Sequence, residues 1–315
     1  MEIRNRIPLD ELKNATGRTA EDVLSSDGAV LVPRGSDIGA VLGSIPDLPD
    51  QLRRRGIGYL SIVRNTDVSF EEFSGMLDRA EPAIERLDPD LARHTLHQVQ
   101  EVYQRIVSGT DSREAVWGLV REGRTLAREV AKAPQILLCL GRVRSWDEYT
   151  FVHSLNVSLL GSYVASHLVP ERPDLAEAMA VGGLLHDFGK ASIPLGILNK
   201  PGRLTEDEFA IMRRHPEYGE AIARNSGVAD PKILSVVRGH HERWDGCGYP
   251  DGTAAETASL EARIAAVVDV FDALTTKRIY KDAMGSRMAV SLIVGSAGTH
   301  FDGRVVRALL RQLGL

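Results

Sequence analysis

Histidine is concentrated in one part of this chain, and that concentration limits its possible folds more than any other feature. Six of the nine histidines fall between residues 153 and 241, and five of these are candidate ligands, namely His153, His186, His215, His240 and His241. Asp187 and Asp269 add carboxylates to the same region. One histidine beside apolar residues is usually a packed core residue, but five with two aspartates match the nitrogen and oxygen ligands of first-row transition metals. The pattern predicts a metal site.

Helical periodicity indicates how these residues could meet. From Trp146 onward, apolar residues recur at helical spacing with short breaks. Helices are predicted over about 146–169, 175–186, 205–222, 260–276 and 302–313; Pro170 and Pro173 close the first, Gly189 terminates the second, and a capping box at Thr205–Glu208 opens the third. His153, His215 and Asp269 each share a helix face with apolar residues, so we expect them to point into a bundle core. Facing helices commonly build metal sites in such cores.

The first 144 residues differ from the rest. Short β-prone runs bounded by Gly, Pro and Asp, at 29–32 and 59–63, predict a small module with some strand. Helical patterns follow at 91–107 and 113–132. The expected fold is mainly α in three parts: a small mixed α/β N-terminal module at 1–65, a helical linker or regulatory region at 66–144, and an all-α bundle with a metal centre at 145–315.

Composition narrows the partners and the compartment. The net charge of −5 provides no global basic field, so a nucleic acid polymer is not an expected partner. Two cysteines are too few and too far apart for a disulfide framework, which fits a reducing compartment. The N-terminus has no apolar signal core, and no run of 18 apolar residues occurs. We therefore expect a cytoplasmic protein without direct membrane insertion.

Adjacent ligands make a geometric demand on the metal site. His186 and Asp187 would point about 100° apart on a helix, so one metal cannot easily take both. An Asp187 carboxylate that bridges two metals, with His186 on one of them, resolves this conflict. Two metals about 3.5–4 Å apart activate water and clamp a phosphoryl group, which predicts phosphodiester hydrolysis. Lys190 follows within one turn and could neutralise a phosphate oxygen as charge builds.

The same residues belong to a longer series of motifs that resembles a known family. The series reads Tyr149-Thr150-x-x-His153, His186-Asp187-x-Gly189-Lys190, Lys200-Pro201-Gly202, His215, His240-His241-Glu242-x-Trp244-Asp245-Gly246-x-Gly248-Tyr249-Pro250, Asp269-x-x-Asp272, Arg278-x-Tyr280-Lys281 and His300-Phe301-Asp302. From about residue 145 to 313 the sequence resembles the HD-GYP family, a branch of the HD phosphohydrolase superfamily. Ile279 and Gly303 stand where the family commonly has proline, which should have modest effects.

The resemblance implies a bacterial second-messenger enzyme, a metal-dependent phosphodiesterase that opens cyclic di-GMP to pGpG. Whether the reaction ends at pGpG or continues to GMP stays open at the level of sequence. The implied metals are iron or manganese. By position, one metal would be held by His153, His186, Asp187 and Asp269, and a second by the bridging Asp187 with His215, His240 and His241. Some members hold a third metal through a glutamate where this chain has Tyr149, so two divalent ions are expected.

The resemblance also assigns roles to residues beyond the metals. Asp187 and Lys190 would be catalytic, with Lys190 on the scissile phosphate. Tyr249, Arg278 and Lys281 would hold the guanine nucleotide and its other phosphate, because a flat dianionic ligand suits a ring, a guanidinium fork and a point charge.

Several alternatives stay open at the level of sequence. The substrate could be another cyclic dinucleotide such as cyclic GMP-AMP, or the chain could be a catalytically silent cyclic dinucleotide-binding or interaction module. Asp272 could orient a histidine ligand or lie on a helix surface, and His300 is more readily explained as structural. A homodimer or a signalling-protein partner is compatible with the N-terminal regions.

Overall fold

The computed structural model describes residues 2–14, 18–24, 30–65, 84–133, 136–138, 146–200, 202–275 and 286–312. Within these ranges helices predominate, and the strands are short or confined to the N-terminal module. The prediction of a mainly α protein is therefore confirmed. Among the described residues, no helix has both the length and the apolar character that a membrane span requires.

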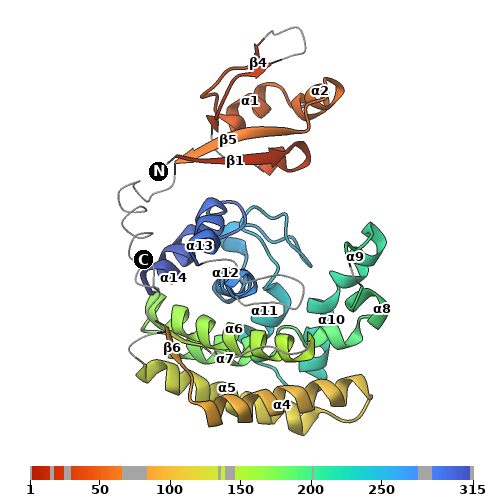
Figure 1. The fold of residues 1–315 in the computed structure, drawn as a ribbon, viewed down its shortest axis with the longest axis vertical. Helices are drawn as coiled ribbons and strands as arrows, with labels where there is room; N and C mark the ends of the chain where they lie inside the picture. The colour runs from red at the N-terminus through yellow and green to blue at the C-terminus, as the bar shows by residue number, and fades with distance from the viewer. Residues whose placement is uncertain are drawn as a thin grey trace.

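The N-terminal module is a small sheet covered by short helices (Figure 1). Its strands are β1 (Glu2–Pro8), β2 (Arg18–Thr19), β3 (Val23–Leu24), β4 (Val30–Val32) and β5 (Tyr59–Asn65), and its helices are the 3₁₀ helix η1 (Leu9–Asn14), α1 (Ile38–Ser44) and α2 (Leu48–Arg54). The antiparallel sheet has the order β1-β5-β2, and β3 pairs with β4. Buried Leu12, Ile38, Leu52 and Ile62 give this module a core of its own, as expected for a mixed α/β unit.

Two long helices lie along one side of the bundle, α4 (Pro89–Val107) and α5 (Arg113–Lys132) (Figure 1). Asp88 caps α4 by accepting from the backbone amides of Asp90 and Leu91 at 3.0 Å. The strands β6 (Ile84–Arg86) and β7 (Ile136–Leu138) flank the two helices and pair in parallel. Apolar residues of both helices, such as Val99 and Leu119, belong to the same buried cluster as α6 and α7. The long helices therefore share the core of the bundle.

The bundle proper is built on α6 (Trp146–Leu168) and α7 (Pro173–Leu185), with α12 (Leu260–Thr275) near its centre (Figure 1). The remaining helical elements are η2 (Phe188–Ser192), α8 (Leu195–Leu198), α9 (Glu206–Met212), α10 (His215–Asn225), α11 (Pro231–Gly239), η3 (Ala255–Thr257), α13 (Ser286–Gly295) and α14 (Gly303–Gln312). α6 and α7 pack very closely, because a Cβ added at Gly183 would lie 2.5 Å from the Cα of Ser158. This close packing brings His153 of α6 beside the end of α7.

Three local predictions are wrong. Pro173 opens α7 instead of closing the preceding helix, because its missing N–H costs nothing in the first turn of a helix. The helix predicted over 205–222 is two helices, since Pro216 starts a new first turn in α10 and α9 ends at Met212. Gly189 does not terminate a helix, because α7 has already ended at Leu185 and Gly189 lies inside η2.

Candidate metal centre

Three of the five clustered histidines occupy helix ends, where their side chains are held by the backbone. His186 and His240 are the C-cap residues of α7 and α11, and His215 is the first residue of α10. The Nδ1 atom of each lies 2.8–2.9 Å from the carbonyl oxygen three residues earlier. Because a carbonyl only accepts, each Nδ1 carries the proton and donates it. Each Nε2 is thereby left as a free lone pair, the form in which imidazole binds a metal.

The first group of potential ligands is formed by His153, His186 and Asp269, whose donor atoms lie within 4.8 Å of one another. His153 Nε2 is 3.0 Å from Asp269 Oδ1. On the other side of the ring, His153 Nδ1 donates to Asp272 Oδ2 at 2.7 Å, and Asn156 donates to Asp272 Oδ1 at 2.9 Å. Asp272 therefore orients a candidate metal ligand, which decides between the two interpretations of this residue.

The second group is formed by His215, His240 and His241. The Nε2 atoms of His215 and His240 are only 3.0 Å apart. Since both histidines use Nδ1 as the donor, two lone pairs face each other in a buried space, and such a contact requires a cation between or beside them. His241 Nδ1 lies 3.8 Å from Asp269 Oδ2, which connects this group to the first.

Asp187 lies between the two groups. Its Oδ2 is 3.3 Å from His186 Nε2, and its Oδ1 is 3.6 Å from His215 Nε2. His186, Asp187 and His240 themselves form a third set of donor atoms within 4.8 Å. The two oxygens of one carboxylate thus face one histidine from each group. This is the geometry that a bridging ligand needs.

The donor atoms are those of a metal site rather than of an ordinary polar core. His186 Nε2 is fully buried and has no hydrogen-bond partner among the described residues, although Asp187 Oδ2 is near. A buried polar atom left without a partner costs about 1–3 kcal/mol, so native proteins rarely leave one without a reason. A divalent cation would satisfy this nitrogen and the facing pair of His215 and His240 together.

Burial also sets the protonation of the second group. It lowers the pKa of His215 to about 3 and that of His241 to about 4, and it holds the pKa of His240 well below its ordinary value. These imidazoles are therefore neutral at neutral pH, as metal binding requires. In the first group, burial opposes a charge on His153, but its hydrogen bonds to the carboxylates of Asp269 and Asp272 outweigh this effect and raise the pKa of His153 to about 10. A cation bound to His153 Nε2 would replace the proton that this nitrogen shares with Asp269 Oδ1.

Lys190 and Tyr249 lie at the rim of the cluster. Lys190 Nζ donates to Asp187 Oδ2 at 2.6 Å. The Tyr249 ring lies 4.7 Å from the His241 ring, centroid to centroid. Burial, followed by the charges of Asp269 and Asp187, raises the pKa of Tyr249 above its ordinary value, so the phenol stays protonated and can donate a hydrogen bond. Both residues are near the metal ligands and partly exposed.

A buried carboxylate holds the loop that carries Tyr249. Glu242 Oε1 accepts from the backbone amides of Asp251 at 2.7 Å and Gly252 at 3.1 Å, and its Oε2 accepts from Thr253 at 2.9 Å. Gly248 lies so close to the backbone of 241–243 that an added Cβ would come within 2.6 Å of several atoms there. The loop is thus fixed against the end of α11. No role was predicted for Glu242 from the sequence, although this residue stands directly beside the histidine pair.

The remaining sequence predictions fall outside the cluster or outside the described residues. Arg278 and Lys281 lie outside the described ranges, and Tyr149 is helical but its side chain is not described. His300 is partly buried, its carbonyl accepts from the amide of Trp244 at 2.9 Å, and its ring stacks on Phe301. It lies in none of the three donor groups, in agreement with a structural role.

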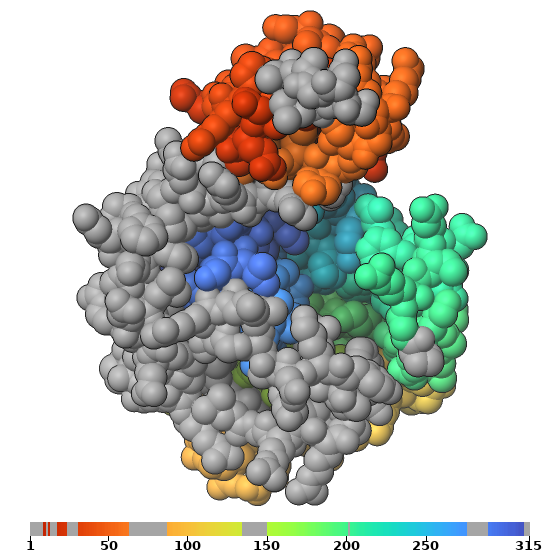
Figure 2. Space-filling view, turned by 45° about the horizontal axis from the view of Figure 1, so that its top comes forward, coloured from red at the N-terminus to blue at the C-terminus, as the bar shows by residue number. Residues whose placement is uncertain are grey.

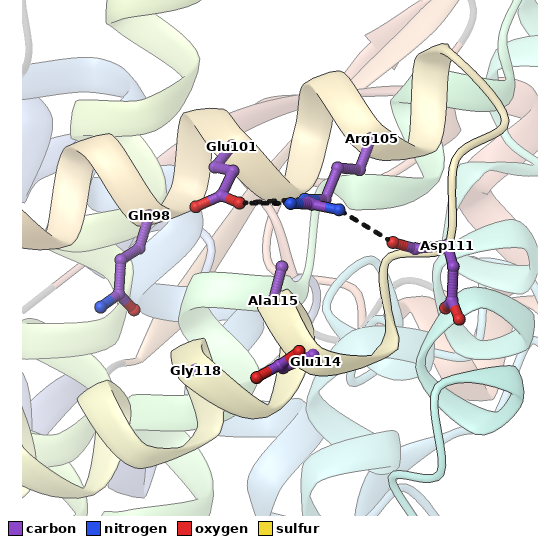
Figure 3. Close-up of a pocket in the computed structure, with 7 residues that line it drawn as sticks. All are labelled: Gln98, Glu101, Arg105, Asp111, Glu114, Ala115 and Gly118. Carbon is purple, nitrogen blue, oxygen red and sulfur yellow. Dashed lines mark hydrogen bonds and ion pairs between the residues drawn. The ribbon is translucent and has the colours of Figure 1, made fainter.

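A separate cavity of about 430 Å³ lies between α4 and α5 (Figure 3). Its lining includes Glu101, Arg105, Asp111 and Glu114 and none of the seven clustered residues. Arg105 donates to Glu101 at 2.9 Å and to the carbonyl of Asp111 at 3.3 Å, so its charge is used within the lining. This cavity does not extend the candidate metal centre.

Comparison with known proteins places this arrangement in a family. The model of the HD domain matches residues 138–305, which is more than half of the chain. The chain is 41% identical over 191 residues to a cyclic di-GMP phosphodiesterase of Pseudomonas aeruginosa, covering 60% of this chain and 45% of the relative. It is 44% identical over 155 residues to the cyclic di-GMP phosphodiesterase response regulator RpfG of Xanthomonas campestris, covering 48% and 41%. The chain thus spans less than half the length of these relatives.

Other similarities broaden the substrate range within the family and support the fold. A 3'3'-cGAMP-specific phosphodiesterase of Vibrio cholerae is 36% identical over 171 residues, covering 54% of this chain and 33% of the relative. A solved HDG"Y"P protein of Bdellovibrio bacteriovorus aligns over the full length of both chains with a TM-score of 0.54 at 15% identity, a likeness of fold alone. On the family match and these relatives, the chain belongs to the HD domain family, in its HD-GYP branch.

Proposed function

We propose that this chain is a metal-dependent phosphodiesterase that hydrolyses cyclic di-GMP to linear pGpG, with further hydrolysis to GMP as an open alternative. The strongest support is the position of Asp187, whose Oδ2 lies 3.3 Å from His186 Nε2 and whose Oδ1 lies 3.6 Å from His215 Nε2. Relatives named as cyclic di-GMP phosphodiesterases support the choice of substrate. The chain's location in the bacterial cytoplasm and its association with itself or with a signalling protein remain predictions.

The ligand assignment follows the two groups of donor atoms. His153, His186 and Asp269 would hold one divalent ion, and His215, His240 and His241 a second, with Asp187 shared between them. Iron and manganese suit this mixture of imidazole and carboxylate ligands. Bound in this way, two divalent ions supply activated water and a clamp for the scissile phosphate.

The chain's own residues then position the substrate. The Lys190 ammonium, 2.6 Å from Asp187, would neutralise charge that builds on the scissile phosphate. The protonated Tyr249 phenol would donate to the nucleotide beside His241. We also keep Arg278 and Lys281, which lie outside the described residues, as predicted contacts of the nucleotide and its second phosphate.

The test is turnover by the purified chain loaded anaerobically with iron or manganese, with cyclic di-GMP and 3'3'-cyclic GMP-AMP in parallel. We expect linear pGpG from cyclic di-GMP and about two metal ions per chain by elemental analysis. The Asp187→Ala variant should lose both metals and turnover. Preferred hydrolysis of cyclic GMP-AMP would reassign the substrate, and tight nucleotide binding without turnover would support a silent binding module.

A further inference from the structure

Arg213 is an exposed cation beside the candidate metal centre, at the break between α9 and α10. Its guanidinium carbon lies 4.8 Å from the centroid of the Tyr249 ring and 5.9 Å from that of Phe209. Both distances lie within the range of about 6 Å in which an aromatic ring attracts a cation. Arg213 stands two residues before His215, and Tyr249 in turn lies against His241. One aromatic ring therefore separates this positive charge from the second group of metal ligands.

The charge of Arg213 is not neutralised by the part of the protein that the structure describes. No carboxylate there lies within ion-pair distance of it, whereas the neighbouring Arg214 pairs with Glu217 at 3.5 Å and lies over the Tyr218 ring. Arg238, also near this end of the bundle, pairs with Glu220 at 2.8 Å and Asp251 at 2.7 Å. Both of these neighbouring arginines therefore have an acidic partner, whereas Arg213 has none among the described residues.

The aromatic contact of Arg213 is unusual for a surface position. Phe209 is 47% exposed, although a phenylalanine on a helix would normally bury its ring. Contact with Phe209 and Tyr249 restricts the Arg213 side chain, which reduces the conformational entropy that it would lose on binding a ligand. In Figure 2, the green to turquoise segment that contains α9 and α10 lies across a recess from the blue segment that contains α12. Arg213 and the candidate ligand His215 both belong to the first of these two segments.

We propose that Arg213 binds an anionic phosphodiester of the cyclic dinucleotide, the one that is not being hydrolysed. This inference rests on the proposed phosphodiesterase function. A cyclic dinucleotide is a dianion, and the metals with Lys190 would serve only one of its two phosphates. Arg213 would contact the second phosphate together with Arg278 and Lys281, which are predicted there from outside the described residues. A guanidinium binds phosphate oxygens in a bidentate manner, which an ammonium cannot do. Arg213 is therefore a specificity-determining residue for ligands with two phosphodiesters.

The test compares Arg213→Gln and Arg213→Lys with the matched control Arg214→Gln in the metal-loaded full chain. We expect Arg213→Gln to raise KM for cyclic di-GMP about tenfold with kcat within about threefold, because uniform binding is lost and the chemistry is kept. Arg213→Lys should recover part of the affinity through its charge, and Arg214→Gln should behave as the parent chain. Higher salt should weaken the parent more than Arg213→Gln. Metal content and circular dichroism should be the same in all four proteins.

An unchanged KM in Arg213→Gln, or loss of metal in that variant, would overturn the proposal. A parent-like KM in Arg213→Gln together with a raised KM in Arg213→Lys would indicate that Arg213 makes a hydrogen bond to the guanine edge. That result would overturn the phosphate assignment. If the parent chain binds cyclic di-GMP without turnover, the proposed function fails, and the same comparison of dissociation constants still tests Arg213. No binding by the metal-loaded parent would overturn both.

Discussion

His215 and His240 place their Nε2 atoms 3.0 Å apart, while the Nδ1 of each donates to a backbone carbonyl three residues earlier. The backbone thereby fixes both tautomers before any ligand arrives, and two lone pairs converge from α10 and α11. Such convergence is unfavourable without a cation and favourable with one. The folded chain is therefore preorganised for metal, and part of the metal-binding free energy should appear as stability.

Asp272 offers a way to change the metal site without removing a ligand. Asp272→Asn should weaken metal binding by about 10–100-fold, because one amide cannot accept from both His153 and Asn156 as the carboxylate does. Metal affinity is measured by competition with a chelator, with the exposed Asp174→Asn as control. An unchanged affinity would show that orientation of His153 does not depend on Asp272.

Gly189 tests how closely η2 must approach α10. A Cβ at Gly189 would overlap the carbonyl oxygen of His215, whereas one at Gly196 would meet no atom within 4 Å. Gly189→Ala should lower the free energy of unfolding by about 2 kcal/mol or more and reduce metal content, because His215 must move. Gly196→Ala should be neutral in the same denaturant titration. Equal stability of the two variants would contradict this packing.

Glu242 should control nucleotide affinity through the loop it holds. In Glu242→Gln, an amide NH₂ would face backbone N–H groups that the carboxylate now satisfies, at a cost of about 1–3 kcal/mol. We expect KM to rise about five- to tenfold with metal content unchanged, because the Tyr249 loop loosens. Steady-state kinetics and elemental analysis check this, with the exposed Glu256→Gln as control. Loss of metal would instead place Glu242 in the support of His241.

His300 should make the protein sensitive to acid. Burial, followed by the charge of Arg243, lowers its pKa from 6.5 to about 4. The unfolded chain therefore takes up a proton at His300 near pH 6.5 and the folded chain only near pH 4, so stability present above pH 6.5 is lost as the pH falls through this window.

Replacing His300 by glutamine separates its contribution to pH-dependent stability from that of the metal-site histidines. Between pH 7 and 4.5, the parent chain should lose about 1–2 kcal/mol more stability than His300→Gln, given about 1.4 kcal/mol per pKa unit and partial exposure. The exposed His97→Gln on α4 serves as control. Parallel pH profiles of the parent and His300→Gln would refute the shift.

The sequence alone determined the class of fold, the seven clustered residues and the family. Helical periodicity and the spacing of histidine and aspartate are local properties of the chain, and Asp187 was singled out as a bridge because adjacent helical residues diverge. The limits of the helices were less predictable. Pro173 and Pro216 each open a helix, and only the packing of the flanking segments decides whether a proline ends one helix or begins the next.

Only the tertiary structure decided which atoms face each other. The backbone carbonyls that fix three histidine tautomers, and the carboxylate of Asp272 behind His153, act across helix ends and across 119 residues of sequence. Arg213 shows most clearly that contacts depend on the tertiary structure, because its sequence neighbour Arg214 has the same side chain. Both contact an aromatic ring, but Arg214 also pairs with a carboxylate on its own helix, whereas Arg213 lies against Tyr249, in a loop 36 residues away. The pair of Arg214 with Glu217 is local in sequence, at i and i+3, but the contact of Arg213 with Tyr249 depends on packing that the order of residues does not specify.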